Sequence, residues 1–117
     1  MNIWLDDIRS APENTKWDAH CFNARAAILL IKTGKVKYIS FDHDLGPGPT
    51  GYDVALEIEE LAAKKKIPPI SYYIHSANPV GAQNIRRAME RAIAFWKEDG
   101  QEEGWFSEET TEEARVE

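Results

Sequence analysis

The chain has 117 residues, of which 43% are hydrophobic and 29% are charged, a balance that fits one globular domain. Its one cysteine excludes an internal disulfide, and no apolar run reaches the roughly 20 residues of a membrane span. The N-terminus has no basic segment followed by a long apolar stretch, so we expect a cytoplasmic protein without a signal peptide. The net charge of -6 is unevenly distributed: residues 98–117 carry -8 and the rest of the chain +2. The negative total charge therefore does not exclude a phosphate-bearing ligand.

The predicted elements alternate between short apolar strands and longer amphipathic helices. We expect strands at residues 2–5, 16–21, 36–41 and 70–74. We expect helices at residues 23–33, 53–66 and 81–96. Asn23 is a suitable N-cap for the first helix, and Pro68 and Pro69 end the second. Residues 8–15 and the Gly- and Pro-rich segment 43–51 are predicted to be loops.

Strands that alternate with helices predict an α/β fold with a mostly parallel sheet of about four strands and right-handed crossovers. We assign residues 1–98 to this domain and residues 99–117 to an acidic C-terminal tail. The tail is poor in apolar residues, so we expect that it can be removed without loss of the fold.

Polar side chains follow three of the predicted strands directly. These side chains are Asp6, Asp7, Asp42, His43, Asp44, His75, Ser76 and Asn78. In a parallel α/β sheet the carboxyl ends of the strands meet at one edge, where ligands bind. Carboxylates gathered there repel one another unless a cation neutralises them. We therefore expect Mg²⁺ or Mn²⁺ to bind at Asp6, Asp7 and Asp42.

Each of these residues also has a simpler interpretation. A single aspartate after a strand is often a helix cap or a turn residue. Asn78, which precedes Pro79, suits the N-cap of the last helix. The N-terminus of that helix could itself bind phosphate. Arg9 is either a surface arginine or a bidentate partner for a phosphate. The convergence of three strand ends favours a functional site.

The strand ends resemble the receiver domain of response regulators. In that family an acidic pair and a phospho-accepting aspartate bind Mg²⁺, which implies these roles for Asp6, Asp7 and Asp42, and Ser76 matches the hydroxyl residue that contacts the phosphoryl group. The resemblance covers residues 2–96 and implies a truncated, flavodoxin-like three-layer fold. Two differences are visible: no lysine follows a fifth strand, and a loop replaces the helix after the first strand.

A closer resemblance lies in three segments: Trp-Leu-Asp-Asp-Ile-Arg, Asp-His-Asp-Leu-Gly with Thr-Gly-Tyr-Asp, and His-Ser-Ala-Asn-Pro-Val-Gly. These are similar to the cyclic-phosphate processing receiver domains, a divergent group linked by prediction to RNA repair. The resemblance implies a ligand that is a phosphate-containing small molecule or an RNA end.

Chemical roles can be assigned to the predicted site residues. Asp42 would attack phosphorus or position the attacking water, and Asp44 would handle protons, as in the similar Asp-x-Asp phosphatases. His43 and His75 titrate near neutral pH and suit proton transfer to a leaving oxygen. We therefore expect a metal-dependent phosphoesterase, with Arg9, Ser76 and Asn78 contacting the substrate. The alternatives are a non-catalytic receiver-like signalling or ligand-binding module phosphorylated at Asp42, and an interaction protein that uses its acidic tail.

Overall fold

The computed structural model describes residues 1–13 and 15–98, which contain four strands and three helices in alternation. The strands are β1 (Asn2–Leu5), β2 (Ala19–Cys21), β3 (Tyr38–Phe41) and β4 (Ser71–Ile74). The helices are α1 (Ala24–Ile31), α2 (Gly51–Ala63) and α3 (Pro79–Glu98). The predicted tail, residues 99–117, lies outside the described residues.

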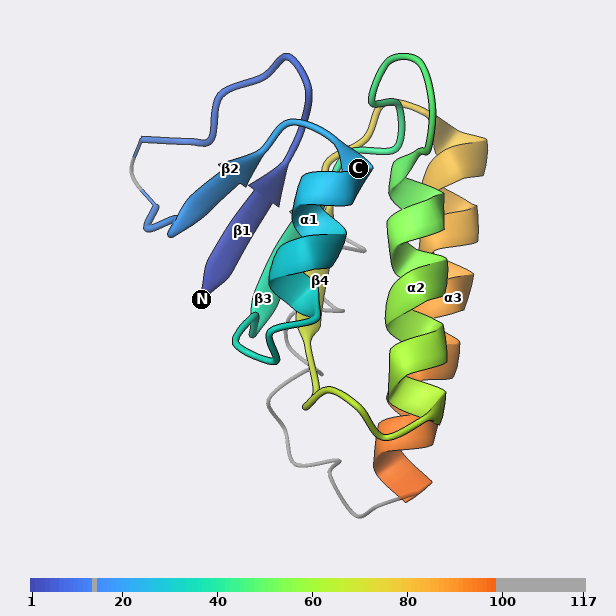
Figure 1. Ribbon diagram of the computed structural model, residues 1–117. Helices are drawn as coiled ribbons and strands as arrows, with labels where there is room; N and C mark the ends of the chain where they lie inside the picture. The colour runs from blue at the N-terminus through green and yellow to red at the C-terminus, as the bar shows by residue number, and fades with distance from the viewer. Residues whose placement is uncertain (14, 99–117) are drawn as a thin grey trace.

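The four strands form one parallel sheet in the order β2-β1-β3-β4. The register pairs Leu5 with both Cys21 and Phe41, and Phe41 with Ile74, so all four strands end level with one another. All four carboxyl ends therefore open onto one edge of the sheet, which is uppermost in Figure 1. The predicted α/β class, the parallel four-stranded sheet and the truncated receiver-like arrangement are confirmed.

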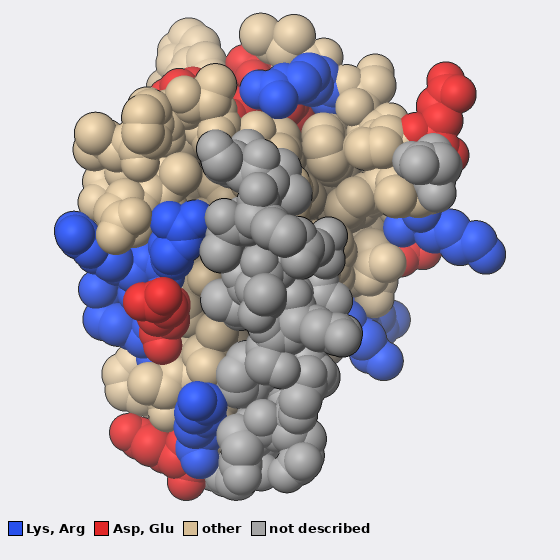
Figure 2. Space-filling view, turned by 180° about the vertical axis from the view of Figure 1, so that it is seen from behind, with Lys and Arg blue, Asp and Glu red and all other residues tan. Residues whose placement is uncertain are grey.

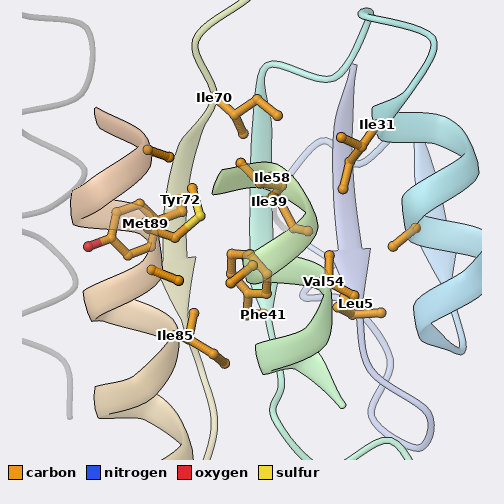
Figure 3. Close-up of a cluster of buried hydrophobic side chains, with 14 of the residues drawn as sticks. Leu5, Ile31, Ile39, Phe41, Val54, Ile58, Ile70, Tyr72, Ile85 and Met89 are labelled. Carbon is orange, nitrogen blue, oxygen red and sulfur yellow. The ribbon is translucent and has the colours of Figure 1, made fainter. Parts of the chain in front are cut away.

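The three helices pack on one face of the sheet. The steps from β2 to β3 and from β3 to β4 run in the same direction across the sheet, so right-handed crossovers place α1 and α2 on the same face. α3 packs closely against α2. Figure 3 shows the resulting core, in which Val54 and Ile58 of α2 and Ile85 and Met89 of α3 meet the strands.

The opposite face of the sheet is crossed by a loop. The step from β1 to β2 runs the other way across the sheet, so its connection, of which residues 6–13 and 15–18 are described, passes over this second face. Trp17 of this loop packs against Trp4 and Tyr38, with ring centroids 5.3 and 5.7 Å apart. Among the described residues, the third layer that we expected therefore contains a loop and no helix. Pro12 and the turn-forming residues around it explain why a helix does not form there.

Several predicted boundaries were wrong. β2 begins at Ala19 rather than at residue 16, and β3 begins at Tyr38 rather than at residue 36. α2 begins at Gly51, inside the predicted loop, because Thr50 and Asp53 form a capping box that starts the helix two residues early. α3 also begins two residues earlier than expected, at Pro79. The predicted N-cap Asn23 is confirmed, since its side chain accepts a hydrogen bond from the Ala26 N–H.

None of the described helices has the length and apolar character that crossing a lipid bilayer requires.

Candidate functional site

The backbone brings Asp6, Asp42 and His75 together at the carboxyl edge of the sheet. Each follows the last residue of a strand, and each N–H continues the ladder with one further hydrogen bond to the neighbouring strand. Asp6 donates to the Cys21 carbonyl at 3.1 Å, Asp42 to Leu5 at 2.9 Å and His75 to Phe41 at 2.9 Å. Ligand atoms of Asp6, Asp42 and His75 lie within 4.8 Å of one another. The sequence prediction that these strand ends converge therefore matches the geometry.

Asp6 is deeply buried, with 1% of its surface exposed. Its Oδ1 atom accepts hydrogen bonds from the backbone N–H groups of Ile8, at 2.8 Å, and Arg9, at 2.7 Å. Its Oδ2 atom lies 3.0 Å from Nε2 of His75. Burial raises the pKa of Asp6, but these hydrogen bonds outweigh it, so the pKa lies below its usual value. Asp6 is therefore a buried, ionised carboxylate.

His75 is held in one orientation by three contacts. Its ring stacks on the Trp4 indole, with centroids 3.9 Å apart and planes 1° from parallel. Its Nδ1 atom lies 2.7 Å from the Ser40 hydroxyl, and its Nε2 atom faces Asp6. Because the Asp6 carboxylate can only accept, Nε2 carries the proton and Nδ1 accepts from Ser40. Burial lowers the pKa of His75 to about 4, although the hydrogen bond to Asp6 opposes this, so the ring is neutral at pH 7.

Arg9 lies across the same group of residues. Its Nε atom is 3.6 Å from Oδ2 of Asp6, and its Nη1 atom donates to the His75 carbonyl at 3.3 Å. The Arg9 carbonyl in turn accepts a hydrogen bond from the Trp4 indole at 2.8 Å. The side chain is nevertheless 55% exposed. Arg9 therefore brings a positive charge to the rim of the site, where Figure 2 shows basic and acidic side chains side by side at the top of the molecule.

Asp42 lies beside Asp6 and is 7% exposed. Its Oδ1 atom accepts the backbone N–H of His43 at 2.8 Å, and its side chain is also hydrogen-bonded to Ser76. Burial and the adjacent charge of Asp6 raise the pKa of Asp42 above its usual value, although the hydrogen bonds and Arg9 oppose this. Two neighbouring carboxylates whose pKa values shift in opposite directions form an electrostatic arrangement typical of functional sites.

His43, Asp44 and Asn78 form a second group, between the loop after β3 and the start of α3. Nδ1 of His43 lies 2.8 Å from Oδ1 of Asp44, and the Asn78 amide is 3.5 Å from both Asp44 oxygens. The hydrogen bond from His43 lowers the pKa of Asp44. Oδ1 of Asn78 also accepts the Gly81 N–H at 2.9 Å, which caps α3 as the simpler interpretation expected.

The His43 ring leaves no space for a side chain at position 81, which is a glycine. A Cβ atom built there would lie 2.3 Å from Cγ of His43, well inside van der Waals contact. The His43 ring therefore packs directly on the first turn of α3. Ser76 contributes to the same corner, because its hydroxyl accepts the Asn78 N–H at 3.0 Å.

Asp7 is not part of the group of Asp6, Asp42 and His75 whose ligand atoms lie within 4.8 Å of one another. It is partly exposed, and its Oδ2 atom faces the following loop, 3.4 Å from where a Cβ on Gly46 would lie. It still lines the cavity of about 420 Å³ that opens above the strand ends. The other residues of this cavity are Asp6, Ile8, Arg9, Asp42, Asp44, Gly46 and Ala77. The cavity thus combines four carboxylates and one guanidinium with apolar side chains at its rim.

Sequence reasoning did not identify Ser40 and Trp4 as parts of the site. Both lie inside strands and were interpreted, if at all, as core residues. A polar serine in an otherwise apolar strand, one residue before the strand end, is the signal that could have identified Ser40. Trp4 carried no such signal, because only the fold shows that its ring stacks on His75.

The buried, neutral His75 predicts a pH-dependent stability in metal-free buffer. The pKa of His75 is about 4 in the folded state, against an ordinary value of 6.5. Between pH 4 and pH 6.5, therefore, the imidazole of the unfolded chain is protonated and that of the folded protein is not. We expect His75 by itself to lower the free energy of unfolding by about 3 kcal/mol as the pH drops from 6.5 to 4. The raised pKa of Asp42 acts with the opposite sign, and the lowered pKa of Asp6 acts only below pH 4.

Urea unfolding at several pH values, with EDTA present, measures this dependence. His75→Gln should remove most of the slope, whereas His20→Gln, which alters a histidine beside the Asp6 backbone, should retain it. An unchanged slope in His75→Gln would contradict the assignment.

Comparison with known proteins gives one result. The family model described as "Cyclic-phosphate processing Receiver domain" matches residues 1–91, more than three-quarters of the chain and a span that contains every predicted site residue. No curated protein and no solved structure gives a significant match. The family's description supports a role in cyclic phosphate processing and implies a phosphate-containing substrate. The chain belongs to the cyclic-phosphate processing receiver domain family.

Proposed function

We propose that the protein is a metal-dependent phosphoesterase that opens a cyclic phosphate on a nucleotide or an RNA end. The observation that carries this proposal is the pair of buried carboxylates, Asp6 and Asp42, which lie side by side beneath a cavity that Arg9 borders. Two carboxylates in this position create a strong negative potential, and the guanidinium supplies a positive group for the substrate. One cavity therefore offers an anionic ester both a site for a cation and a positively charged side chain to pair with.

The residues present fit a divalent cation. Oxygen donors from the buried Asp6 and Asp42 lie within 4.8 Å of one another and of a ring nitrogen of His75, which is partly buried. Asp7 lies in the same cavity and could hold a water of the cation's hydration shell. When bound, such a cation would neutralise charge on the phosphate oxygens and make water a stronger nucleophile.

The other side chains have roles that follow from their contacts. Arg9 would pair with the phosphate, because its exposed guanidinium has N–H donors beyond its contacts with Asp6 and His75. In the His43–Asp44 pair the carboxylate accepts from Nδ1, which leaves Nε2 to accept or deliver a proton. Ser76 would hold Asp42 in place, and Asn78 would hold Asp44 at the N-terminus of α3.

The proposed reaction is a hydrolysis. Water attacks phosphorus, the bond to one ribose oxygen breaks, and the leaving oxygen receives a proton. The attacking water loses one proton to a base, so the product is a phosphate monoester beside a free hydroxyl. The role proposed for the His43–Asp44 pair is to carry out these two proton transfers.

A panel of cyclic and linear phosphates, assayed with Mg²⁺, Mn²⁺ or EDTA, tests the proposal. We expect turnover of a cyclic nucleotide with either ion and none with EDTA. A second set of samples should contain acetyl phosphate, which phosphorylates ordinary receiver domains on aspartate. Stable labelling of Asp42 combined with no turnover of any ester would favour the signalling module instead.

A further inference from the structure

We propose that His75, and not Asp7, is the third protein ligand of the metal, and that the site therefore prefers a first-row transition ion such as Mn²⁺ over Mg²⁺. This inference rests on the proposed metal site and specifies its donor atoms. Ligand atoms of Asp6, Asp42 and His75 are within 4.8 Å of one another. Asp7 is not part of that group among the described residues, and its carboxylate faces Gly46.

The distance between His75 and Asp6 already suits two neighbouring ligands of one ion. Nε2 of His75 lies 3.0 Å from Oδ2 of Asp6. Two ligand atoms at adjacent corners of an octahedron with bonds of about 2.1 Å lie about 3.0 Å apart. A cation that lies beside the line between these two atoms can therefore contact both without a change in their separation.

The surroundings of His75 permit the required change of tautomer. When Nε2 binds a cation, the ring proton must move to Nδ1, which then needs an acceptor. The Ser40 hydroxyl lies 2.7 Å from Nδ1, and a hydroxyl can either donate or accept. A ligating histidine typically donates its second N–H to such a partner. No net proton is released, because the proton leaves one nitrogen and is gained by the other.

The ring is also held firmly by its neighbours. Trp4 stacks on the whole imidazole face, and the Trp4 indole is itself anchored to the Arg9 carbonyl at 2.8 Å. The His75 side chain is 9% exposed, so water competes little for Nε2. A nitrogen donor held this firmly contributes to affinity without a large loss of side-chain entropy.

The donor set determines which cation is preferred. Mg²⁺ favours oxygen ligands and retains its water shell, whereas imidazole nitrogen is a good ligand for first-row transition ions. A site with two carboxylates and one imidazole should therefore discriminate against Mg²⁺. Arg9 lies 3.6 Å from Oδ2 of Asp6 and opposes any cation, but its side chain is exposed enough to turn towards a phosphate.

Electron spin-echo measurements on the full-length protein with Mn²⁺ test this directly. We expect ¹⁴N modulation from a directly bound imidazole, and its replacement by ¹⁵N frequencies when the histidines are ¹⁵N-labelled, a control that requires no substitution. His75→Gln should remove the modulation and weaken Mn²⁺ binding at least about 10-fold. His20→Gln should keep the modulation and bind within about threefold of the wild type, and Asp7→Asn should keep the modulation. Mg²⁺ should compete at least about 10-fold less well than Mn²⁺.

Bound Mn²⁺ without nitrogen modulation, or loss of binding in Asp7→Asn but not in His75→Gln, would overturn the inference while leaving a metal-dependent esterase intact. Equal competition by Mg²⁺ would overturn the stated preference. If the wild type binds no Mn²⁺ at all, both this inference and the metal dependence of the proposed function fail.

Discussion

Asp42→Asn should lower the metal-dependent turnover of a 2′,3′-cyclic nucleotide by at least about 100-fold. The substitution keeps the size of the side chain and one carbonyl oxygen that can accept from the His43 N–H. It removes the negative charge beside Asp6 that would hold a cation. Because the raised pKa of Asp42 already shows a cost of its charge in the folded protein, Asp42→Asn should leave the melting temperature unchanged or raise it.

Initial rates at saturating metal and a melting curve for each variant measure both effects. Asp53→Asn is a matched control, since Asp53 lies in the first turn of α2 and does not line the cavity. It should keep turnover within about twofold of the wild type, even if weakening the capping box lowers stability by about 1 kcal/mol. An Asp42→Asn variant that retains more than a tenth of the activity would show that Asp42 is not essential.

Gly51→Ala should destabilise the protein by more than about 3 kcal/mol, because it forces α2 away from the backbone of Asp42 and His43, two residues of the site. A Cβ at this position would lie 2.0 Å from the backbone oxygen of Asp42 and 3.1 Å from Cα of His43. These atoms are backbone and cannot rotate away. The first turn of α2 must therefore move, and the Gly51 N–H would lose its 2.8 Å hydrogen bond to the His43 carbonyl.

Chemical unfolding of Gly51→Ala beside Ala63→Gly checks this expectation. Ala63 is exposed at the far end of the same helix, so Ala63→Gly should cost only the usual difference in helix propensity, about 1 kcal/mol. Similar losses of unfolding free energy in the two variants would mean that the start of α2 can move away from the end of β3 at little cost. The close contact between these two segments would then not constrain the site.

The order and type of the elements could be predicted because hydrophobic periodicity is local. Alternating strands and helices indicated a parallel sheet. Because parallel strands end at one edge of a sheet, the sequence alone predicted that Asp6, Asp42 and His75 lie close together. The start of α2 was missed because Gly51 follows a Gly- and Pro-rich run that is typical of a turn. The spacing of Thr50 and Asp53, a capping box, was the signal that favoured the earlier start.

The internal arrangement of the site could not be predicted, because it depends on contacts between distant residues. Asp6 and Asp7 are adjacent aspartates that the sequence does not distinguish. In the structure, Asp6 is buried against His75, whereas Asp7 faces Gly46. The direction of each side chain follows from the pleat of β1 and from the loop after it, which only the fold determines. Likewise, His75 and His43 both had the pattern of proton-transfer residues, but Trp4 and Ser40 bury His75 while His43 packs on α3.

The central claim is that this edge of the sheet opens a cyclic phosphate, and ³¹P NMR of a single reaction tests it most directly. Purified full-length protein would be incubated with a 2′,3′-cyclic nucleotide and Mn²⁺, beside an identical sample of Asp42→Asn. The account predicts that the cyclic-phosphate resonance is replaced by that of a monoester in the wild type and persists in the variant. A resonance that persists equally in both samples, with metal shown to be bound, would contradict it.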